Sequence, residues 1–135
     1  MARDVELRRH TDSDGDALTE EGVRAALEIG RRLVGGYALL VSSGAQPATQ
    51  ALACFACALR EADPELVQED SALAGAALRR VLERLPEDGR ALAVGHSPTN
   101  EAAVLGLTDS IVEPIAKGAG VLVLAERDRT RVAPL

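Results

Sequence analysis

Hydrophobic positions along the chain follow two patterns that alternate with each other. Short runs, either continuous or alternating with polar residues, predict strands over 4–9, 37–41, 65–68, 90–94, 120–126 and 130–133. The stretches between most of them carry apolar residues three or four positions apart and predict helices over 20–34, 47–60, 71–85 and 98–107. Strands that alternate with helices favour an α/β fold. We therefore expect one domain over 1–135, with three layers (α/β/α), a mostly parallel central sheet and a C-terminal antiparallel edge hairpin.

The ends of two predicted helices carry capping residues. Thr19 is a good N-cap, and Glu20 and Glu21 follow it where the helix dipole favours negative charge. Ser97 is the expected N-cap of the last helix, with Pro98 at its first position. The stretch 11–17, between the first strand and the first helix, is expected to be a polar loop.

The composition restricts the class of protein. Hydrophobic residues make up 47% of the 135 residues but aromatic residues only 1%, so the core must be aliphatic. The net charge of −6 argues against the basic face that nucleic-acid binding needs. No apolar run approaches the length of a membrane span, and no signal peptide is recognisable. We expect a cytoplasmic protein without nucleic-acid or membrane partners, and the sequence leaves its oligomeric state open.

The two cysteines, Cys54 and Cys57, lie inside an apolar helical stretch, ALACFACAL. A redox pair needs its first thiol at a helix N-terminus, and a structural zinc site needs two further ligands. Neither condition is met, because the pair lies in mid-helix and the chain has no second pair. We therefore expect both cysteines to be buried in the core.

The only two histidines occupy equivalent places in the predicted fold. His10 follows the first strand and His96 follows the fourth, and each precedes a helix. Ligands of open α/β sheets bind at the carboxyl ends of the strands. Asp12 and Asp14 do not give the histidines the spacing of a zinc site, so we expect no metal. A phosphoryl site suits these residues better, because Arg9 offers a bidentate cation, a helix start offers N–H groups, and histidine forms covalent intermediates.

The same residues also have structural interpretations, which the sequence leaves open. His10 could be an ordinary strand-end histidine, and Arg9 could form a surface ion pair with Asp12 or Asp14, a contact that contributes little. Ser42 and Ser43, after the second strand, are expected to be loop and capping residues rather than ligands.

Three segments, in order along nearly the whole chain, resemble motifs of the histidine phosphatase (phosphoglycerate mutase-like) superfamily. The first is LRRH (7–10) with LTEEG (18–22), similar to the Arg-His-Gly and Leu-Thr-x-x-Gly motifs of that superfamily. The others are VSS (41–43) with TQA (49–51), and VGHSP (94–98). The short chain is most similar to the SixA-type phosphohistidine phosphatases.

This resemblance implies a role for each matching residue. His10 would be the nucleophile that becomes phosphorylated, and His96 would stabilise the transferring group. Arg9 would be catalytic and, with Thr11 and Ser97, would bind the phosphate. The general acid is not defined by a motif; we predict Asp12, which is close to the nucleophile, with Glu69 and Glu101 as alternatives. The resemblance implies no cofactor and no metal.

Two positions depart from the superfamily pattern. Thr11 replaces the glycine after the nucleophile, and Pro47 replaces the second pocket arginine. Proline has neither charge nor donor, and an arginine that stabilises a transferring phosphoryl group contributes about 10³–10⁵ in rate. Arg8 and Arg24 are the candidates to replace that cation.

Two functions follow from these residues. The first is a phosphatase that acts through a phosphohistidine on His10, with a phosphorylated small molecule or a phosphohistidine protein as its partner. The second is a weak or inactive relative that binds a phosphorylated ligand or a protein. Arg9, His10 and His96 favour the first function, and Pro47 favours the second.

Overall fold

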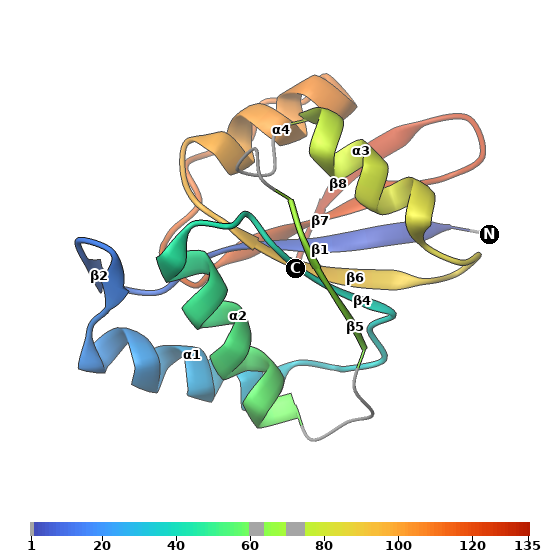
Figure 1. Ribbon diagram of the computed structural model, residues 1–135. Coiled ribbons are helices and arrows are strands. Elements are labelled where there is room, and N and C mark those ends of the chain that lie inside the picture. Colours follow the sequence, from blue (N-terminus) through green and yellow to red (C-terminus); the bar gives the residue numbers. More distant parts are fainter. Residues whose placement is uncertain (1, 60–63, 70–74) are drawn as a thin grey trace.

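The computed structural model describes residues 2–59, 64–69 and 75–135, which form a six-stranded sheet, a small hairpin and four helices (Figure 1). The strands are β1 (Arg3–Arg9), β2 (Ser13–Asp14), β3 (Ala17–Leu18), β4 (Leu39–Ser42), β5 (Glu65–Gln68), β6 (Arg90–Gly95), β7 (Gly120–Ala125) and β8 (Thr130–Pro134). The helices are α1 (Glu20–Arg32), α2 (Gln46–Leu59), α3 (Gly75–Arg84) and α4 (Thr99–Thr108).

The sheet has the order β5-β4-β6-β1-β7-β8. Its first four strands are parallel, whereas β7 runs antiparallel to β1 and β8 antiparallel to β7. Helices α1 and α2 cover one face of the sheet, and α3 and α4 cover the other (Figure 1). The predicted α/β architecture, with its mostly parallel sheet and its antiparallel edge hairpin, is therefore confirmed.

Alternation within β6 explains why both faces of the sheet are covered, because Ala91 and Ala93 join one core and Leu92 and Val94 join the other. Val5 and Leu7 are completely buried in the core on the α3–α4 side. On the α1–α2 side a second core gathers around Phe55 and Leu52 of α2 and Leu92 of β6. Each such large side chain contributes about 1.5–3 kcal/mol when it is removed from water. The two cores hold the central strands, and with them the strand ends, in a fixed frame.

A buried polar cluster lies on the α1–α2 side of β1. Glu6, only 4% exposed, accepts a hydrogen bond from the Tyr37 hydroxyl (2.7 Å) and one from Nε of Arg8 (2.6 Å). Burial, and then this hydrogen bond to Glu6, raise the pKa of the Tyr37 phenol well above its usual value. The two contacts compensate the cost of burying the Glu6 carboxylate. They also hold the Arg8 guanidinium against the sheet.

Helices α1 and α2 pack closely because Gly30 has no side chain. A Cβ at this position would lie 2.7 Å from Cβ of Ala58 and 2.9 Å from the carbonyl oxygen of Phe55. Not all apolar residues of the predicted helix 20–34 face the core, since Val23 is 37% exposed and Val34, which lies beyond the end of α1, is 84% exposed. The buried face of α1 consists instead of its small residues, Gly22, Ala26 and Gly30, which allow the close approach.

Three further predictions are corrected. The stretch 11–17 is not only a loop, because the short strands β2 and β3 pair across it. Ser97 is not an N-cap: α4 begins at Thr99, its N-cap is Pro98, and no side chain caps it. The cysteines are not core residues, because α2 packs through Ala48, Ala51, Leu52 and Phe55, which leaves Cys54 half-buried and Cys57 exposed.

The remaining element predictions agree with the structure to within a few residues wherever it describes them. The predicted helix boundaries at Arg60 and Ser71 lie outside the described residues. Thr19 caps α1 as expected, because its hydroxyl accepts a hydrogen bond from the Gly22 N–H (3.0 Å). No described helix is long and apolar enough to cross a membrane.

Candidate active site

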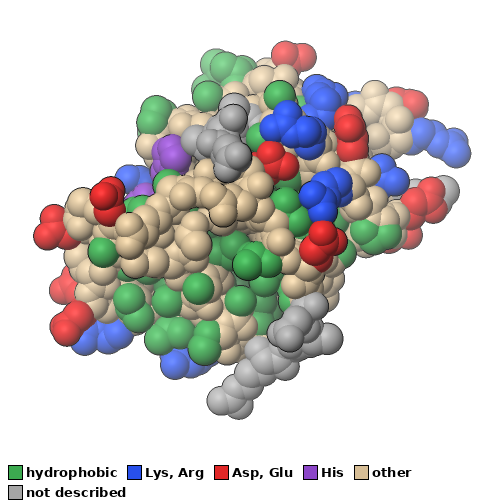
Figure 2. Space-filling model, viewed as in Figure 1, with side chains coloured by type: hydrophobic (Ala, Val, Ile, Leu, Met, Phe, Trp, Pro, Cys, Tyr) green, Lys and Arg blue, Asp and Glu red, His purple; other side chains and the backbone are tan. Residues whose placement is uncertain are grey.

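The two histidines follow neighbouring parallel strands. In the register of β1 and β6, Arg9 lies opposite Gly95, and the His10 N–H donates to the Gly95 carbonyl (3.0 Å). His10 and His96 therefore leave the same edge of the sheet one strand apart. Figure 2 shows histidine side chains gathered at one place on the surface, at the end of the molecule where these strands end in Figure 1.

The His10 ring is oriented by its own chain. Nδ1 of His10 lies 2.7 Å from the carbonyl oxygen of Thr11. A carbonyl only accepts hydrogen bonds, so Nδ1 carries a proton in this contact, and the lone pair of the neutral form of the ring is then on Nε2. A fixed ring with an unprotonated Nε2 is the form of histidine that acts as a nucleophile.

Arg9 is anchored at one end of its guanidinium. Nη1 donates to the carbonyl of Ile115 (3.0 Å), in the segment before β7, and Nε is buried without a partner among the described residues. Within that same part of the chain no ion pair joins Arg9 to Asp12 or Asp14. The surface ion pair is thus not formed, and neither acid compensates the charge of Arg9.

Thr11 locks the turn after the nucleophile. It is only 2% exposed, and its hydroxyl donates to the Gly22 carbonyl (2.6 Å). Gly22 approaches the same turn so closely that a Cβ there would lie 2.0 Å from the Asp12 carbonyl oxygen. Because its hydroxyl proton is used in this way, the predicted contact of Thr11 with phosphate would have to come from its backbone.

Asp12 is held by two partners. Its carboxylate accepts hydrogen bonds from the Thr19 hydroxyl (2.9 Å) and from Nζ of Lys117 (2.5 Å). The contact with Lys117, followed by that with Thr19, lowers the pKa of this carboxyl below its usual range. A carboxyl that stays ionised is a poor proton donor, so these contacts favour a positioning role for Asp12. Its predicted role as general acid stays a prediction.

The segment after His96 is tied to both strands. The Asn100 N–H donates to the His96 carbonyl (2.9 Å), and its side-chain amide donates to the Arg8 carbonyl (3.1 Å). The Ser97 hydroxyl donates to Oε2 of Glu101, whose Oε1 is buried without a partner among the described residues. Asn100 is completely buried and joins the ends of β1 and β6 through these two hydrogen bonds. The sequence did not predict this role, because a buried asparagine in the first turn of a helix has the same pattern as a solvated one.

The third strand end at this edge belongs to β4. The Ser43 N–H donates to the Val94 carbonyl (3.1 Å), which brings the turn before α2 next to β6. Ser43 lies in the turn as expected, whereas Ser42 is the last residue of β4; their hydroxyls accept hydrogen bonds from the N–H groups of Ala45 (3.4 Å) and Gly44 (3.1 Å), respectively. Pro47 lies in the first turn of α2 beyond them. The alternative acid Glu69 follows β5, where its carboxylate pairs with Arg80 (3.1 Å).

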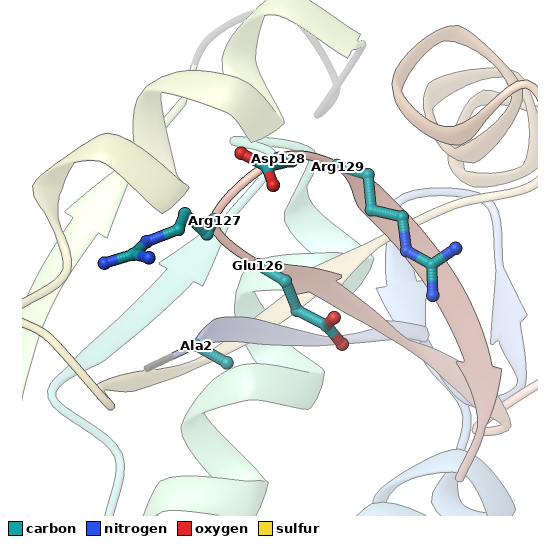
Figure 3. A pocket seen from close by; sticks show the side chains of 5 residues that line it. All are labelled: Ala2, Glu126, Arg127, Asp128 and Arg129. Carbon is teal, nitrogen blue, oxygen red and sulfur yellow. The ribbon is translucent and has the colours of Figure 1, made fainter.

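A different hollow, of about 690 Å³, lies at the turn between β7 and β8 (Figure 3). It is lined by Ala2, Glu126, Arg127, Asp128 and Arg129. Arg3 at the start of β1 pairs with Ala125, so this hollow lies at the opposite end of the sheet from the histidines. No described cluster of three histidine, cysteine or acidic side chains could hold a metal ion.

Comparison with known proteins finds similarity at the level of structure. No protein-family profile matches the sequence, and no curated protein matches it. The structure of the protein histidine phosphatase SixA complexed with tungstate is similar, with a TM-score of 0.78 at 18% identity over 96% of this chain and 94% of that one. Phosphoglycerate mutase from Bacillus anthracis str. Sterne has a TM-score of 0.85 at 12% identity, over 99% of this chain and 92% of that one. Phosphoserine phosphatase from Entamoeba histolytica, in complex with 3-phosphoglyceric acid, has a TM-score of 0.76 at 12% identity over 97% and 95%.

These matches and the strand order define an α/β protein with the fold of the histidine phosphatase superfamily. The SixA-type phosphohistidine phosphatases, which share nearly the full length of the chain, are among the structures of that fold to which it is similar. The resemblance first seen in the motifs thus agrees with the fold.

Proposed function

We propose that the protein is a phosphatase that removes a phosphoryl group from phosphohistidine, or from a small phosphoester, through a phosphohistidine on His10. The observation that carries this proposal is the contact between Nδ1 of His10 and the Thr11 carbonyl (2.7 Å), which leaves Nε2 as the nucleophile. Two of the similar structures support the substrate class, since one is a protein histidine phosphatase and the other a phosphoserine phosphatase.

The reaction has two balanced steps. Nε2 of His10 attacks phosphorus and forms a P–N bond while the bond to the leaving nitrogen or oxygen breaks; the leaving group keeps that electron pair and takes a proton. Water then attacks the phosphohistidine and releases a proton, which balances the one taken by the leaving group; the P–N bond breaks with its electrons returning to Nε2, and inorganic phosphate departs. No cofactor is required by this scheme.

The other residues of the site are proposed to stabilise the negative charge on the phosphoryl oxygens. We propose that Arg9 and His96 donate hydrogen bonds to these oxygens, and such preorganised donors are worth most in the transition state. Ser97 is proposed to contact the phosphate through its backbone, because its hydroxyl is bonded to Glu101. Phosphohistidine has an imidazole leaving group, which lowers the demand on a general acid.

The second candidate function is a binding module for a phosphorylated ligand or protein. Pro47 favours it, because the position that carries a second arginine in the superfamily resemblance has no charge here. A protein with one phosphate-binding arginine can retain binding of the anion while phosphoryl transfer is slow.

The two functions are separated by a phosphorylation experiment on the full chain. The protein is mixed with phosphoramidate, quenched without acid, and examined by intact mass and peptide analysis. Since the chain has only two histidines, which are 86 positions apart, peptide analysis distinguishes a phosphate on His10 from one on His96. His10→Asn and His96→Asn are the matched variants.

A phosphate on His10 that turns over, and that is lost in His10→Asn, is the expected result. Absence of both adduct and turnover, in a folded protein that still binds phosphate, overturns the phosphatase proposal and leaves the binding module.

A further inference from the structure

The chain contains 15 basic residues, and Lys117 is its single lysine. It lies in the irregular segment between α4 and β7, at the edge of the sheet where both histidines emerge. Its Nζ contacts Asp12, two residues beyond His10 (2.5 Å). The one lysine of the chain therefore belongs to the neighbourhood of the nucleophile, although no motif pointed to it.

The backbone beside Lys117 is fixed against β1. The Gly118 N–H lies 3.0 Å from the Arg9 carbonyl and 3.2 Å from that of His10, and the Arg8 guanidinium donates to the Gly118 carbonyl (2.8 Å). Gly118 has a φ of +77°, and a Cβ there would lie 2.7 Å from Ile29 and 3.2 Å from the Thr11 side chain. Lys117 is thus presented from a backbone that cannot move independently of the nucleophile.

The other candidate cations are placed differently. Arg8 was a candidate to replace the arginine missing at Pro47, but its guanidinium is bonded to Glu6 and to the Gly118 carbonyl. Arg24, the second candidate, is an exposed residue of α1. Arg9 is already part of the site. Lys117 is 48% exposed in its side chain, so a ligand from solvent can reach it.

We propose that Lys117 is the second cation that binds the phosphoryl group beside His10, in the role that Pro47 cannot fill. This inference rests on the proposed function. An ammonium has three N–H donors and the contact with Asp12 uses one, so two can meet phosphoryl oxygens while Asp12 holds the group in place. A compact point charge on a flexible stem is a recurrent phosphate ligand in proteins.

The first test measures binding of inorganic phosphate to the full chain by calorimetry. Lys117→Met is expected to weaken binding by about 10- to 100-fold, the effect of removing one hydrogen bond from a charged group to an anion. Lys117→Arg keeps the charge and is expected to retain most of the affinity. Arg131→Met is the matched control, because Arg131 is also a half-exposed, ion-paired cation (2.7 Å from Glu126), on the edge strand β8.

Asp12→Asn separates ligand binding from a structural role of the ion pair. If Lys117 binds phosphate, Asp12→Asn removes the competing negative charge while the amide oxygen can still accept from Nζ, so phosphate binding is kept or tightened. If the pair only supports the fold of the segment, Asp12→Asn and Lys117→Met must weaken binding alike, and that result overturns the inference.

The single ε-amine also gives a direct signal. Reductive methylation with ¹³C-formaldehyde labels Lys117 and the amino terminus only, and the methylated amine keeps its charge. Inorganic phosphate is expected to shift the Lys117 resonance with the dissociation constant found by calorimetry. The role of Lys117 is overturned if phosphate binds without shifting this resonance and Lys117→Met has no effect on binding. If His10 is still phosphorylated as proposed, that result leaves the proposed function intact. Loss of both phosphate binding and the His10 adduct in the wild-type protein overturns both.

Discussion

The N–H of His10 donates to the carbonyl of Gly95, the residue directly before His96. This single backbone contact sets the spacing of the two histidines, because it belongs to the ladder between β1 and β6. The two histidines therefore follow neighbouring strand ends, which is the backbone arrangement that the proposed reaction needs.

Substitution of His96 tests this arrangement. His96→Asn is expected to slow the phosphorylation of His10 by about 10²–10³-fold, the cost of removing one preorganised donor from a transition state. Quench-flow with phosphoramidate measures the rate, and the far-ultraviolet spectrum should be unchanged. An unaltered rate would show that His96 does not act on the transferring group.

An arginine at position 47 should supply the second arginine that the superfamily resemblance implies for the phosphate site. Pro47 lies in the first turn of α2, where arginine is compatible with a helix. Pro47→Arg is expected to recover at least about tenfold of the phosphate affinity lost in Lys117→Met, since a cation is returned to the same site. Calorimetry on the single and double variants makes the comparison. Failure of the double variant to recover affinity would place position 47 outside the site.

The carboxyl of Asp12 should titrate at an unusually low pH. Its contact with Lys117 is the largest cause that lowers its pKa from 3.8. The native state then binds this proton less tightly than the unfolded chain, so the contact stabilises the fold at neutral pH and its contribution is lost as the pH falls through the lowered pKa. Carboxyl ¹³C NMR of wild type and Lys117→Met should show the midpoint rising towards 3.8 in the variant. Identical midpoints would mean that the ion pair does not form in solution.

The phenol of Tyr37, the single tyrosine, offers an optical test of the buried cluster. Because burial raises its pKa above the usual 10.0, phenolate absorbance should appear only with alkaline unfolding. Tyr37→Phe removes a hydrogen bond to the Glu6 carboxylate and should cost about 1.5–3 kcal/mol in urea unfolding. Titration of the phenol near pH 10 in the folded protein would contradict the hydrogen bond.

Two helical glycines form a matched pair for packing. Gly30→Ala pushes a methyl group into Ala58 and Phe55 and should destabilise the protein by about 1–3 kcal/mol. Gly106→Ala in α4 meets nothing within 4 Å and should stabilise it by up to about 1 kcal/mol through helix propensity. Urea unfolding of the two variants gives both values. Equal and small effects would show that α1 and α2 are not in close contact.

Much of the fold was predictable because local patterns and tertiary packing agree. The alternation of Val5 and Leu7 marks β1 correctly, and the hydroxyl of Thr19 caps α1 as its position suggests. The prediction that Ser97 is the N-cap of α4 was wrong. A serine before a proline is a typical N-cap, but here the Ser97 hydroxyl donates to the Glu101 carboxylate instead. The prediction that Cys57 is buried, which rested on the general preference of cysteine for the core, was wrong. Which face of a helix is buried depends on the elements that it packs against and not on the type of a single residue.

The site was predictable only where it coincides with strand ends. His10, His96 and Arg9 follow or end apolar runs and could be placed together by topology alone. Lys117 could not, since the stretch before β7 has no periodic pattern and its approach to Asp12 spans 105 positions. The only feature of the sequence that distinguishes Lys117 is that it is the single lysine among the 15 basic residues.

Arg8 and Arg9 leave β1 in succession, and both bind the segment before β7, at Gly118 and Ile115. Arg9 therefore supports the segment that presents Lys117, in addition to its proposed contact with phosphate. Losses measured for Arg9 and for Lys117 separately should overlap, because removing the first disturbs the second. A rate deficit in an Arg9 variant would then overstate what its own charge contributes, and only the double variant apportions the two.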